Sequence, residues 1–215
     1  MGKPYNVILF DVDGTLVNTD ELIYQTFVEL YKKYIPHKKV ERKDTLYFSG
    51  PPIKKTLMEE FKNVPIEVSL KEYHDISYTK YQSTVTLFEG VKETLEELKN
   101  KNIKLGIITN KLHETTEYCF SLLGILPYFS SNLICSNDVT RGKPSEESFI
   151  KAKEVMKLKN SDNILYVGDN LIDLEFANNA KIDCAIVTYT DRKLVFDKSP
   201  TYLINNFSFL LELIK

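Results

Sequence analysis

The sequence lacks the features that mark membrane, nucleic-acid-binding and secreted proteins. No apolar stretch approaches the length of a membrane span, so no membrane partner is expected. The net charge is −2 and no long basic run occurs, so nucleic acid is not an expected partner either. The first strand-like run begins at Val7, which leaves no room for a signal peptide.

Cysteine is scarce and its spacing matches no redox or metal motif. Cys119, Cys135 and Cys184 are an odd number, contain no Cys-x-x-Cys pair and have apolar neighbours. We expect them to be small buried hydrophobic residues in a reducing compartment, which predicts a cytoplasmic protein. The histidines are scattered and lack the spacing of metal ligands.

What the chain does have is a regular alternation of strand-like and helix-like segments. Its 215 residues suffice for one large domain or for a core with a smaller insert. The expected strands cover residues 7–10, 103–109, 133–135, 164–167, 184–187 and 202–204. Helical patterns lie between them at about 90–100, 113–123, 145–157 (capped by Ser145), 171–179 and the C-terminal end. This alternation is typical of a parallel sheet with helices on both faces.

A long helical stretch interrupts this pattern after the first strand. It contains a helix from Asp20 to Tyr34, with Asp20 as its cap, a helix after Pro52 and a helix from Pro65 to about Gln82. No convincing strand occurs in it. The sequence therefore predicts an α/β protein. A Rossmann-like parallel-sheet core would comprise residues 1–16 and 84–215, with an inserted α-helical cap domain at 17–83.

Polar residues follow four of the expected strands. Because the carboxyl ends of parallel strands lie at one edge of the sheet, these residues should share a crevice. They are Asp11 and Asp13, Thr109 and Asn110, Cys135 to Lys143, and Asp169 to Asp173. Such a set of acids, a hydroxyl, an amide and a lysine suits a phosphoryl group with a divalent cation.

Asp11 and Asp13 can divide the chemistry between them. One carboxylate can attack an electrophile while the other transfers protons. Gly14 permits a tight turn beside a ligand, and Thr15 offers a hydroxyl and a backbone amide. An Asp-x-Asp pair alone is more often a strand end with acidic turn residues than a catalytic pair, so the other motifs decide the interpretation.

Taken together, the motifs resemble those of the haloacid dehalogenase (HAD) superfamily. They match in order and in their position after strands, and the helical insert looks like that superfamily's cap. The resemblance covers the whole chain, and the four motifs are specific only in combination. They are Asp11-Val12-Asp13-Gly14-Thr15-Leu16, Thr109-Asn110, Gly142-Lys143-Pro144, and Gly168-Asp169-Asn170-Leu171-Ile172-Asp173.

The resemblance implies roles for the acids. Asp11 would be the nucleophile that forms an aspartyl-phosphate, and Asp13 would protonate the leaving oxygen and then activate water. Mg2+ would be held by Asp11, the backbone carbonyl of Asp13, and Asp169. Asp173 would support the metal, largely through water.

The resemblance also implies a phosphate-binding set. Thr109 and Asn110 would bind the oxygens of the transferring phosphoryl group, and Thr15 would assist them. Lys143 would orient the nucleophile and neutralise charge, a task for which the point charge of a lysine is suited.

Some neighbouring residues receive no role. Arg141 and His113 lie close to motifs, yet no step of the chemistry demands them, and Lys111 is undecided. Two positions depart from a common family pattern, because Asn18 stands where many relatives have Asp and Glu146 where many have Pro. Both departures concern the hinge and the subfamily rather than the catalytic residues.

Asp13 favours hydrolysis of a phosphate, since relatives that cleave carbon–halogen bonds lack it. The expected activity is that of a Mg2+-dependent phosphoric monoester hydrolase acting on a small soluble substrate, in a monomer or small homo-oligomer. The loop at 48–53 resembles that of phosphoglycolate phosphatases, pyrophosphatases and some nucleotidases of this superfamily. The resemblance predicts substrate binding by Ser49 and Gly50, with phosphoglycolate as the leading substrate. A plain helix-start turn would explain the same loop.

Other functions stay open at this stage. An inorganic pyrophosphatase, a 5′-nucleotidase and a sugar-phosphate phosphatase or mutase would use the same core. A signalling module with a long-lived phosphorylated aspartate is a non-enzymatic alternative. Asp13 and the cap argue against the signalling module, because an acid–base residue hastens dephosphorylation.

Overall fold

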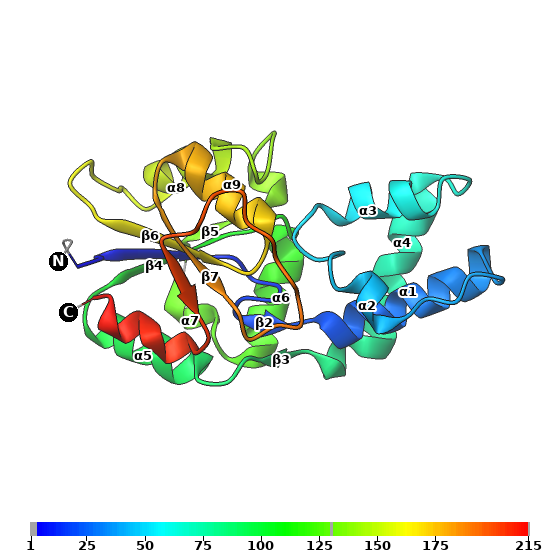
Figure 1. The fold of residues 1–215 in the computed structure, drawn as a ribbon. Helices are drawn as coiled ribbons and strands as arrows, with labels where there is room; N and C mark the ends of the chain where they lie inside the picture. Colours follow the sequence, from blue (N-terminus) through cyan, green and yellow to red (C-terminus); the bar gives the residue numbers. More distant parts are fainter. Residues whose placement is uncertain (1–3, 130, 215) are drawn as a thin grey trace.

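Six parallel strands form the central sheet of the computed structural model, which describes residues 4–129 and 131–214. Their order across the sheet is β5-β4-β1-β6-β7-β8, with β1 near the centre (Figure 1). The strands are β1 (Val7–Phe10), β4 (Lys104–Ile108), β5 (Leu133–Ile134), β6 (Ile164–Gly168), β7 (Asp183–Val187) and β8 (Tyr202–Ile204).

Helices cover both faces of this sheet, as the alternation predicts. Successive β1 side chains point to opposite faces, so Ile8 and Phe10 belong to one buried cluster and Val7 and Leu9 to the other. The first cluster packs beneath α5 (Val91–Asn100), α6 (His113–Leu123), α7 (Leu126–Phe129) and the 3-10 segment η4 (Phe207–Glu212). The second packs beneath α8 (Glu147–Val155) and α9 (Leu171–Ala180).

A separate helical lobe stands beside the carboxyl edge of the sheet (Figure 1). It consists of α1 (Asp20–Tyr34), α2 (Arg42–Thr45), α3 (Ile53–Glu60) and α4 (Ile66–Ile76), which continues as the π-helical turn η1 (Ser77–Tyr81) and the 3-10 turn η2 (Gln82–Thr84). Its interior is aromatic: the ring of Phe27 lies 4.5 Å from that of Phe48 and 5.8 Å from that of Tyr73, centroid to centroid. No helix in the described ranges is both long and apolar enough to cross a membrane.

Two short antiparallel strands join the lobe to the body, β2 (Val17–Asn18) and β3 (Thr86–Leu87). The expectation that no strand occurs at 17–83 is therefore wrong for β2. Two residues are too few to show a period-2 pattern, so the pairing becomes visible only when both crossings of the chain are brought together.

Three helix ends also differ from the sequence predictions. Asp20 is the first residue of α1 rather than its cap, and its carboxylate accepts a hydrogen bond from Arg192. Helix α8 begins at Glu147, whose backbone N–H donates to the Ser145 hydroxyl (3.3 Å). The C-terminal helix is a 3-10 helix, with Asn206 capping it by accepting from the Ser208 N–H.

Candidate active site at the carboxyl edge of the sheet

Lys143 connects three strand ends at the carboxyl edge of the sheet. Its Nζ lies 2.7 Å from Asp11 Oδ1, 2.6 Å from Asp173 Oδ1 and 2.9 Å from the hydroxyl of Tyr166. The Lys143 and Asp173 side chains are fully buried. Burial disfavours the charged ammonium, but the attraction of both carboxylates outweighs it and raises the pKa of Lys143 above its usual value.

Three buried carboxylates lie next to this lysine. Asp11, Asp169 and Asp173 each offer an oxygen within 4.8 Å of the others. Burial raises the pKa of Asp11 to about 6, although Lys143 opposes that shift, and burial raises the pKa of Asp169 as well. Asp173 is held in place because its Oδ2 accepts the backbone N–H groups of Asp169 (3.1 Å) and Asn170 (3.0 Å).

This acid cluster fits a divalent cation. Asp169 Oδ2 is buried and makes no hydrogen bond to any residue that the structure describes, although Arg192 Nη1 lies 3.1 Å away as an ion pair. A side chain at Gly14 would stand 2.1 Å from that oxygen, so only glycine leaves the space open. The charges at the site are also unequal: within the described residues, five carboxylates (Asp11, Asp13, Asp20, Asp169 and Asp173) pair with three cations (Lys111, Lys143 and Arg192). One Mg2+, which prefers carboxylate oxygens, would balance the two excess negative charges.

Asp13 points to the same crevice but pairs with a different cation. Lys111 Nζ donates to both of its oxygens, at 3.0 and 3.2 Å. Both side chains keep some exposure, so Asp13 reaches the cavity described below. The sequence leaves Lys111 undecided, yet it follows Thr109-Asn110 directly and so belongs to the same strand end.

The predicted phosphate-binding residues separate into two groups. Thr109 and Asn110 line the cavity, and Asn110 Nδ2 donates to the carbonyls of Gly50 (2.9 Å) and Lys143 (3.1 Å). Thr15 does not line it, because its buried hydroxyl points to Asp169 Oδ1 at 3.4 Å. Its hydroxyl thus contacts the acid cluster rather than the cavity.

Ser49 and Gly50 lie in the lobe's loop and dock on the sheet edge. The Ser49 carbonyl accepts from Asn170 Nδ2 (3.2 Å), and the Ser49 hydroxyl accepts from Arg192 Nη2. Gly50 has φ +98°, and a Cβ there would lie 2.9 Å from Asn170 Nδ2. The glycine is required by this close approach to the body. Both residues also line the cavity.

Arg192 is a site residue that the sequence analysis missed. Its buried guanidinium donates to Asp20 Oδ1 (2.8 Å) and to Ser49, and pairs with Asp169. It therefore links the lobe to the acid cluster. The sequence does contain a signal for it, because Arg192 follows the strand expected at 184–187. Residues after that strand should share the crevice at the carboxyl edge in the same way as those after the other four strands.

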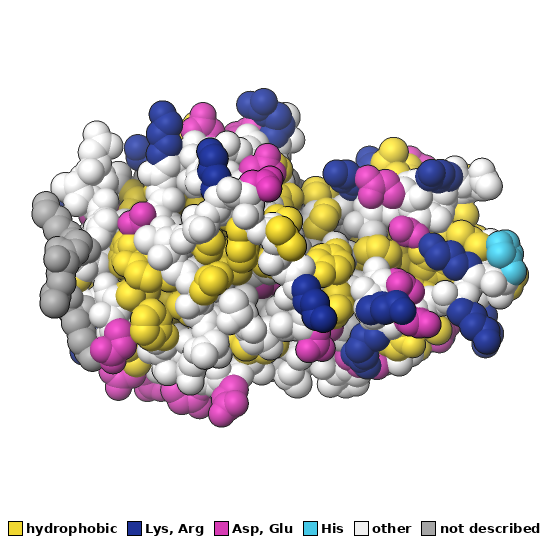
Figure 2. Space-filling view, viewed as in Figure 1, with side chains coloured by type: hydrophobic (Ala, Val, Ile, Leu, Met, Phe, Trp, Pro, Cys, Tyr) yellow, Lys and Arg dark blue, Asp and Glu magenta, His cyan; other side chains and the backbone are white. Residues whose placement is uncertain are grey.

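A cavity of about 320 Å³ lies between the lobe and the sheet edge. Asp11 and Asp13 stand at one end of it, and residues of α1, α4 and the loop at 48–53 form the opposite wall. Figure 2 shows the surface hollowed where the lobe meets the body, with hydrophobic side chains at that junction.

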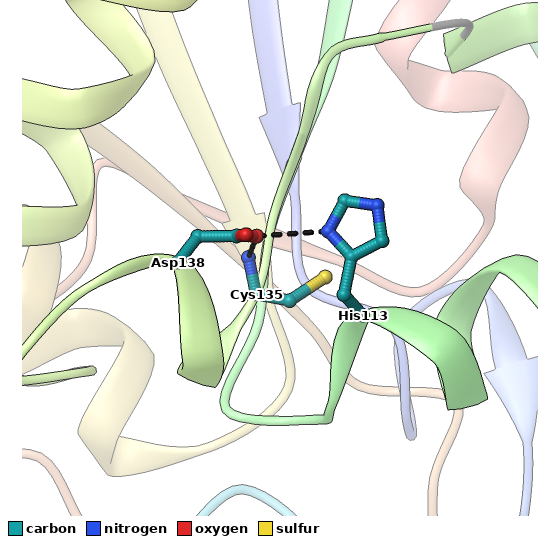
Figure 3. A group of neighbouring side chains, drawn as sticks. All are labelled: His113, Cys135 and Asp138. Carbon is teal, nitrogen blue, oxygen red and sulfur yellow. Dashed lines mark hydrogen bonds and ion pairs between the residues drawn. The ribbon is translucent and has the colours of Figure 1, made fainter.

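A second group of ligand-type side chains lies beside this edge and has a structural explanation. His113 Nδ1 is 2.9 Å from Asp138 Oδ2, which also accepts the Cys135 N–H at 2.8 Å (Figure 3). Asp138 thereby caps the 3-10 turn η3 (Ser136–Asp138) and pairs with the histidine. Its hydrogen bond to His113 raises the pKa of that ring, and burial raises the pKa of the Cys135 thiol to about 12.

A parallel sheet covered by helices, with a buried carboxylate cluster at its carboxyl edge and a helical lobe above it, is typical of an α/β enzyme. A family described as haloacid dehalogenase-like hydrolase matches residues 8–187. The chain belongs to this family, which confirms the predicted resemblance, the α/β fold class and an enzyme of the hydrolase type.

Individual relatives agree with this assignment. The chain is 33% identical to the pyrophosphatase PpaX of Halalkalibacterium halodurans, over 97% of this chain and 96% of that protein. It is 32% identical to the pyrophosphatase PpaX of Bacillus cereus, over 97% of this chain and 96% of that protein. The structure of a predicted phosphoglycolate phosphatase from Haemophilus somnus has a TM-score of 0.81 at 21% identity and covers 98% of both chains, which supports the fold.

Proposed function

We propose that this protein is a Mg2+-dependent phosphatase that hydrolyses a small soluble phosphomonoester through a phosphorylated Asp11. One observation carries the proposal. The buried carboxylate of Asp11 is oriented by Lys143 at 2.7 Å, beside Asp169 and Asp173 and at the end of a cavity. The proposed nucleophile, a lysine and an acid cluster suited to a metal thus lie together at a cavity that a phosphate ester could enter.

Two displacements at phosphorus follow from this arrangement. An Asp11 oxygen attacks phosphorus while the ester P–O bond breaks, and Asp13 gives its proton to the leaving oxygen. Asp13 then takes a proton from water, whose oxygen attacks the same phosphorus and releases phosphate and free Asp11. Lys143 neutralises charge in both steps.

The metal would be held by Asp11, Asp169 and the backbone carbonyl of Asp13, with Asp173 in support. When bound, Mg2+ would reduce the repulsion between a carboxylate and a phosphate dianion. Thr109 and Asn110 line the cavity and are proposed to bind phosphoryl oxygens, and Thr15 would act only through Asp169. Lys111 keeps Asp13 in position.

We further propose that residues 17–83 are a cap domain over a core formed by 1–16 and 84–215. The contacts of Asn110 with Gly50 and of Arg192 with Ser49 support a lobe that docks on the sheet edge. Closing such a lobe shields the reacting groups from bulk water. The free, buried cysteines support the proposed cytoplasmic location.

The substrate is open within this class. The loop at 48–53 suggests phosphoglycolate and pyrophosphate as candidates, and two of the relatives are named pyrophosphatases. Nucleoside monophosphates and sugar phosphates complete the panel. A signalling role is less favoured because Asp13 borders the cavity, where it can promote dephosphorylation.

The test is phosphate release from this panel with Mg2+, for the wild type and Asp11→Asn. We expect turnover of at least one ester and a loss of roughly a thousandfold or more in Asp11→Asn. Asp75→Asn, which changes an exposed lobe residue, is the control. Circular dichroism checks that each variant is folded.

Two results would contradict the proposal. Wild-type turnover by Asp11→Asn would rule out the covalent mechanism, and no turnover of any ester would rule out the phosphatase. A phosphorylated Asp11 that persists for minutes would instead favour the signalling module.

A further inference from the structure

The cavity has one charged end and one apolar end. Asp11, Asp13 and Lys111 form the charged end, where the phosphoryl group would react. The lobe supplies the other wall with side chains that are mostly aliphatic or aromatic, among them Leu22, Ile23, Phe48, Leu70, Tyr73 and Tyr78. The leaving group of an ester bound at Asp11 would lie against this second wall.

Almost every cation near the cavity already has an acidic partner. Lys143 pairs with Asp11 and Asp173, and Lys111 with Asp13. Arg192 pairs with acids as well. The one further cation in the lining is Lys54, which is exposed and has no ion pair within the described part of the chain. A second anionic group on the substrate would therefore find a single solvated ammonium.

Apart from the exposed Lys54, the polar groups on the lobe wall are uncharged. Burial, and secondly the charge of Lys111, lower the pKa of His74, so that its ring is neutral at pH 7. The Tyr73 hydroxyl and the Gln82 amide make no side-chain hydrogen bond within the described ranges, and both residues line the cavity. The wall thus offers aromatic surface with a few neutral hydrogen-bonding groups.

This wall is also firmly positioned. The Tyr73 ring packs edge-on against Phe27 in the lobe interior, with centroids 5.8 Å apart. The Tyr78 hydroxyl donates to Thr115 Oγ1 at 2.6 Å and so connects the wall to the body. Rings fixed in this way suit a flat apolar group, which gains from burial against aromatic surface. An anion would lose its hydration without a buried counter-charge.

Given the phosphatase activity proposed above, on which this step rests, we infer that the substrate is a phosphomonoester whose leaving group carries an uncharged aromatic ring. The ring lies against Tyr73 and Tyr78 while the phosphoryl group lies at Asp11. Phosphoglycolate and pyrophosphate, whose leaving groups are anionic, would be poorer substrates.

Two phosphonates that differ in one group test the inference without any turnover. Benzylphosphonate and phosphonoacetate both carry a phosphonate on a methylene, with a phenyl ring in one and a carboxylate in the other. Calorimetric titration with Mg2+ should show benzylphosphonate binding roughly tenfold tighter or more. Equal affinities, tighter phosphonoacetate, or no binding of either would overturn the inference.

Matched variants assign the effect to the wall. Tyr73→Leu should reduce the affinity ratio of the two phosphonates several-fold, and Tyr73→Phe should restore it, because the ring rather than the hydroxyl provides the contact. Tyr34→Leu removes a ring from the same lobe outside the cavity lining and should leave the ratio as it is. A ratio that falls equally in Tyr34→Leu and Tyr73→Leu would overturn the inference.

Turnover separates this inference from the proposed function. Benzyl phosphate and uridine 5′-monophosphate should both be hydrolysed with higher kcat/KM than phosphoglycolate and pyrophosphate, and their order shows whether the ring lies directly at the phosphate or beyond a sugar. Faster phosphoglycolate or pyrophosphate turnover would overturn the inference and leave the phosphatase intact. No turnover of any ester would overturn both.

Discussion

The sheet edge and the helical lobe use charge in opposite ways. At the sheet edge, Lys143 and Asp173 are fully buried and held 2.6 Å apart. In the lobe, ion pairs such as Lys71–Asp75 lie at the surface, and the interior consists of aromatic rings. Buried charge is costly and clusters at functional sites, so we infer that the sheet edge is the reacting part of the molecule and that the lobe shapes the cavity.

The sharpest test of this division replaces the acid that faces the cavity. Asp13→Ala should reduce kcat by roughly two to four orders of magnitude, the usual contribution of acid–base catalysis. The comparison in the lobe is Asp75→Ala, which removes an exposed carboxylate and should leave kcat unchanged. The measurement is steady-state phosphate release with Mg2+. Equal rates for Asp13→Ala and the wild type would remove Asp13 from the mechanism.

The loss of a cation should also affect the free energy of unfolding much more at the sheet edge than in the lobe. Lys143→Met leaves Asp11 and Asp173 buried without their cation, which should lower the free energy of unfolding by about 3–5 kcal/mol. Lys38→Met removes a half-exposed partner of Glu60 in the lobe and should cost about 1 kcal/mol or less. Urea denaturation at pH 7 measures both. Similar losses of unfolding free energy in the two variants would contradict the proposed difference between buried and exposed charge.

The sequence predicts the sheet edge better than the lobe for a physical reason. Asp11, Thr109 and Asp169 each follow a buried apolar run. The parallel pairing of the strands brings their ends together independently of the conformation of the loops. The residues that line the lobe's wall carry no such signal. Tyr73 and Gln82 fall in a helical segment that was expected, but which of its faces meets the cavity depends on how the lobe docks.

That docking rests on contacts between distant segments. Arg192 reaches Asp20 and Ser49 across the chain, and the pairing of β2 with β3 joins segments on either side of the lobe. Local periodicity contains neither interaction. The gathering of polar residues at the sheet edge could therefore be predicted from the sequence, whereas the shape of the cavity required the structure.

Metal binding should stabilise the body through the acid cluster. At a Mg2+ concentration about a hundred times its Kd, the gain in the free energy of unfolding is about 2.7 kcal/mol. Asp169→Asn should abolish most of this gain, because it removes a carboxylate of the cluster. Thermal melts with Mg2+ and with EDTA measure the effect, and Glu72→Gln in the lobe is the control. An equal Mg2+ response in Asp169→Asn would place the metal elsewhere.

The smallest expected effect concerns an exposed ion pair on the body. It tests whether an ion pair is weak because it is exposed or because it lies in the lobe. His113 and Asp138 form a partly exposed pair on the body. The hydrogen bond to Asp138 raises the pKa of folded His113 above the ordinary 6.5, so the folded state binds the proton more tightly than the unfolded state does. The resulting stability is fully present below about pH 6.5. It is lost as the pH rises through the raised pKa of the folded state.

His113→Gln should therefore destabilise the protein at pH 5.5 by about 1 kcal/mol or less and have almost no effect at pH 9. Urea denaturation at the two pH values measures this, and Asp138 is left in place because it also accepts the Cys135 N–H. A destabilisation that grows with pH would show that neutral His113 is the form that matters, and a loss comparable to that of Lys143→Met would show that position on the body outweighs burial.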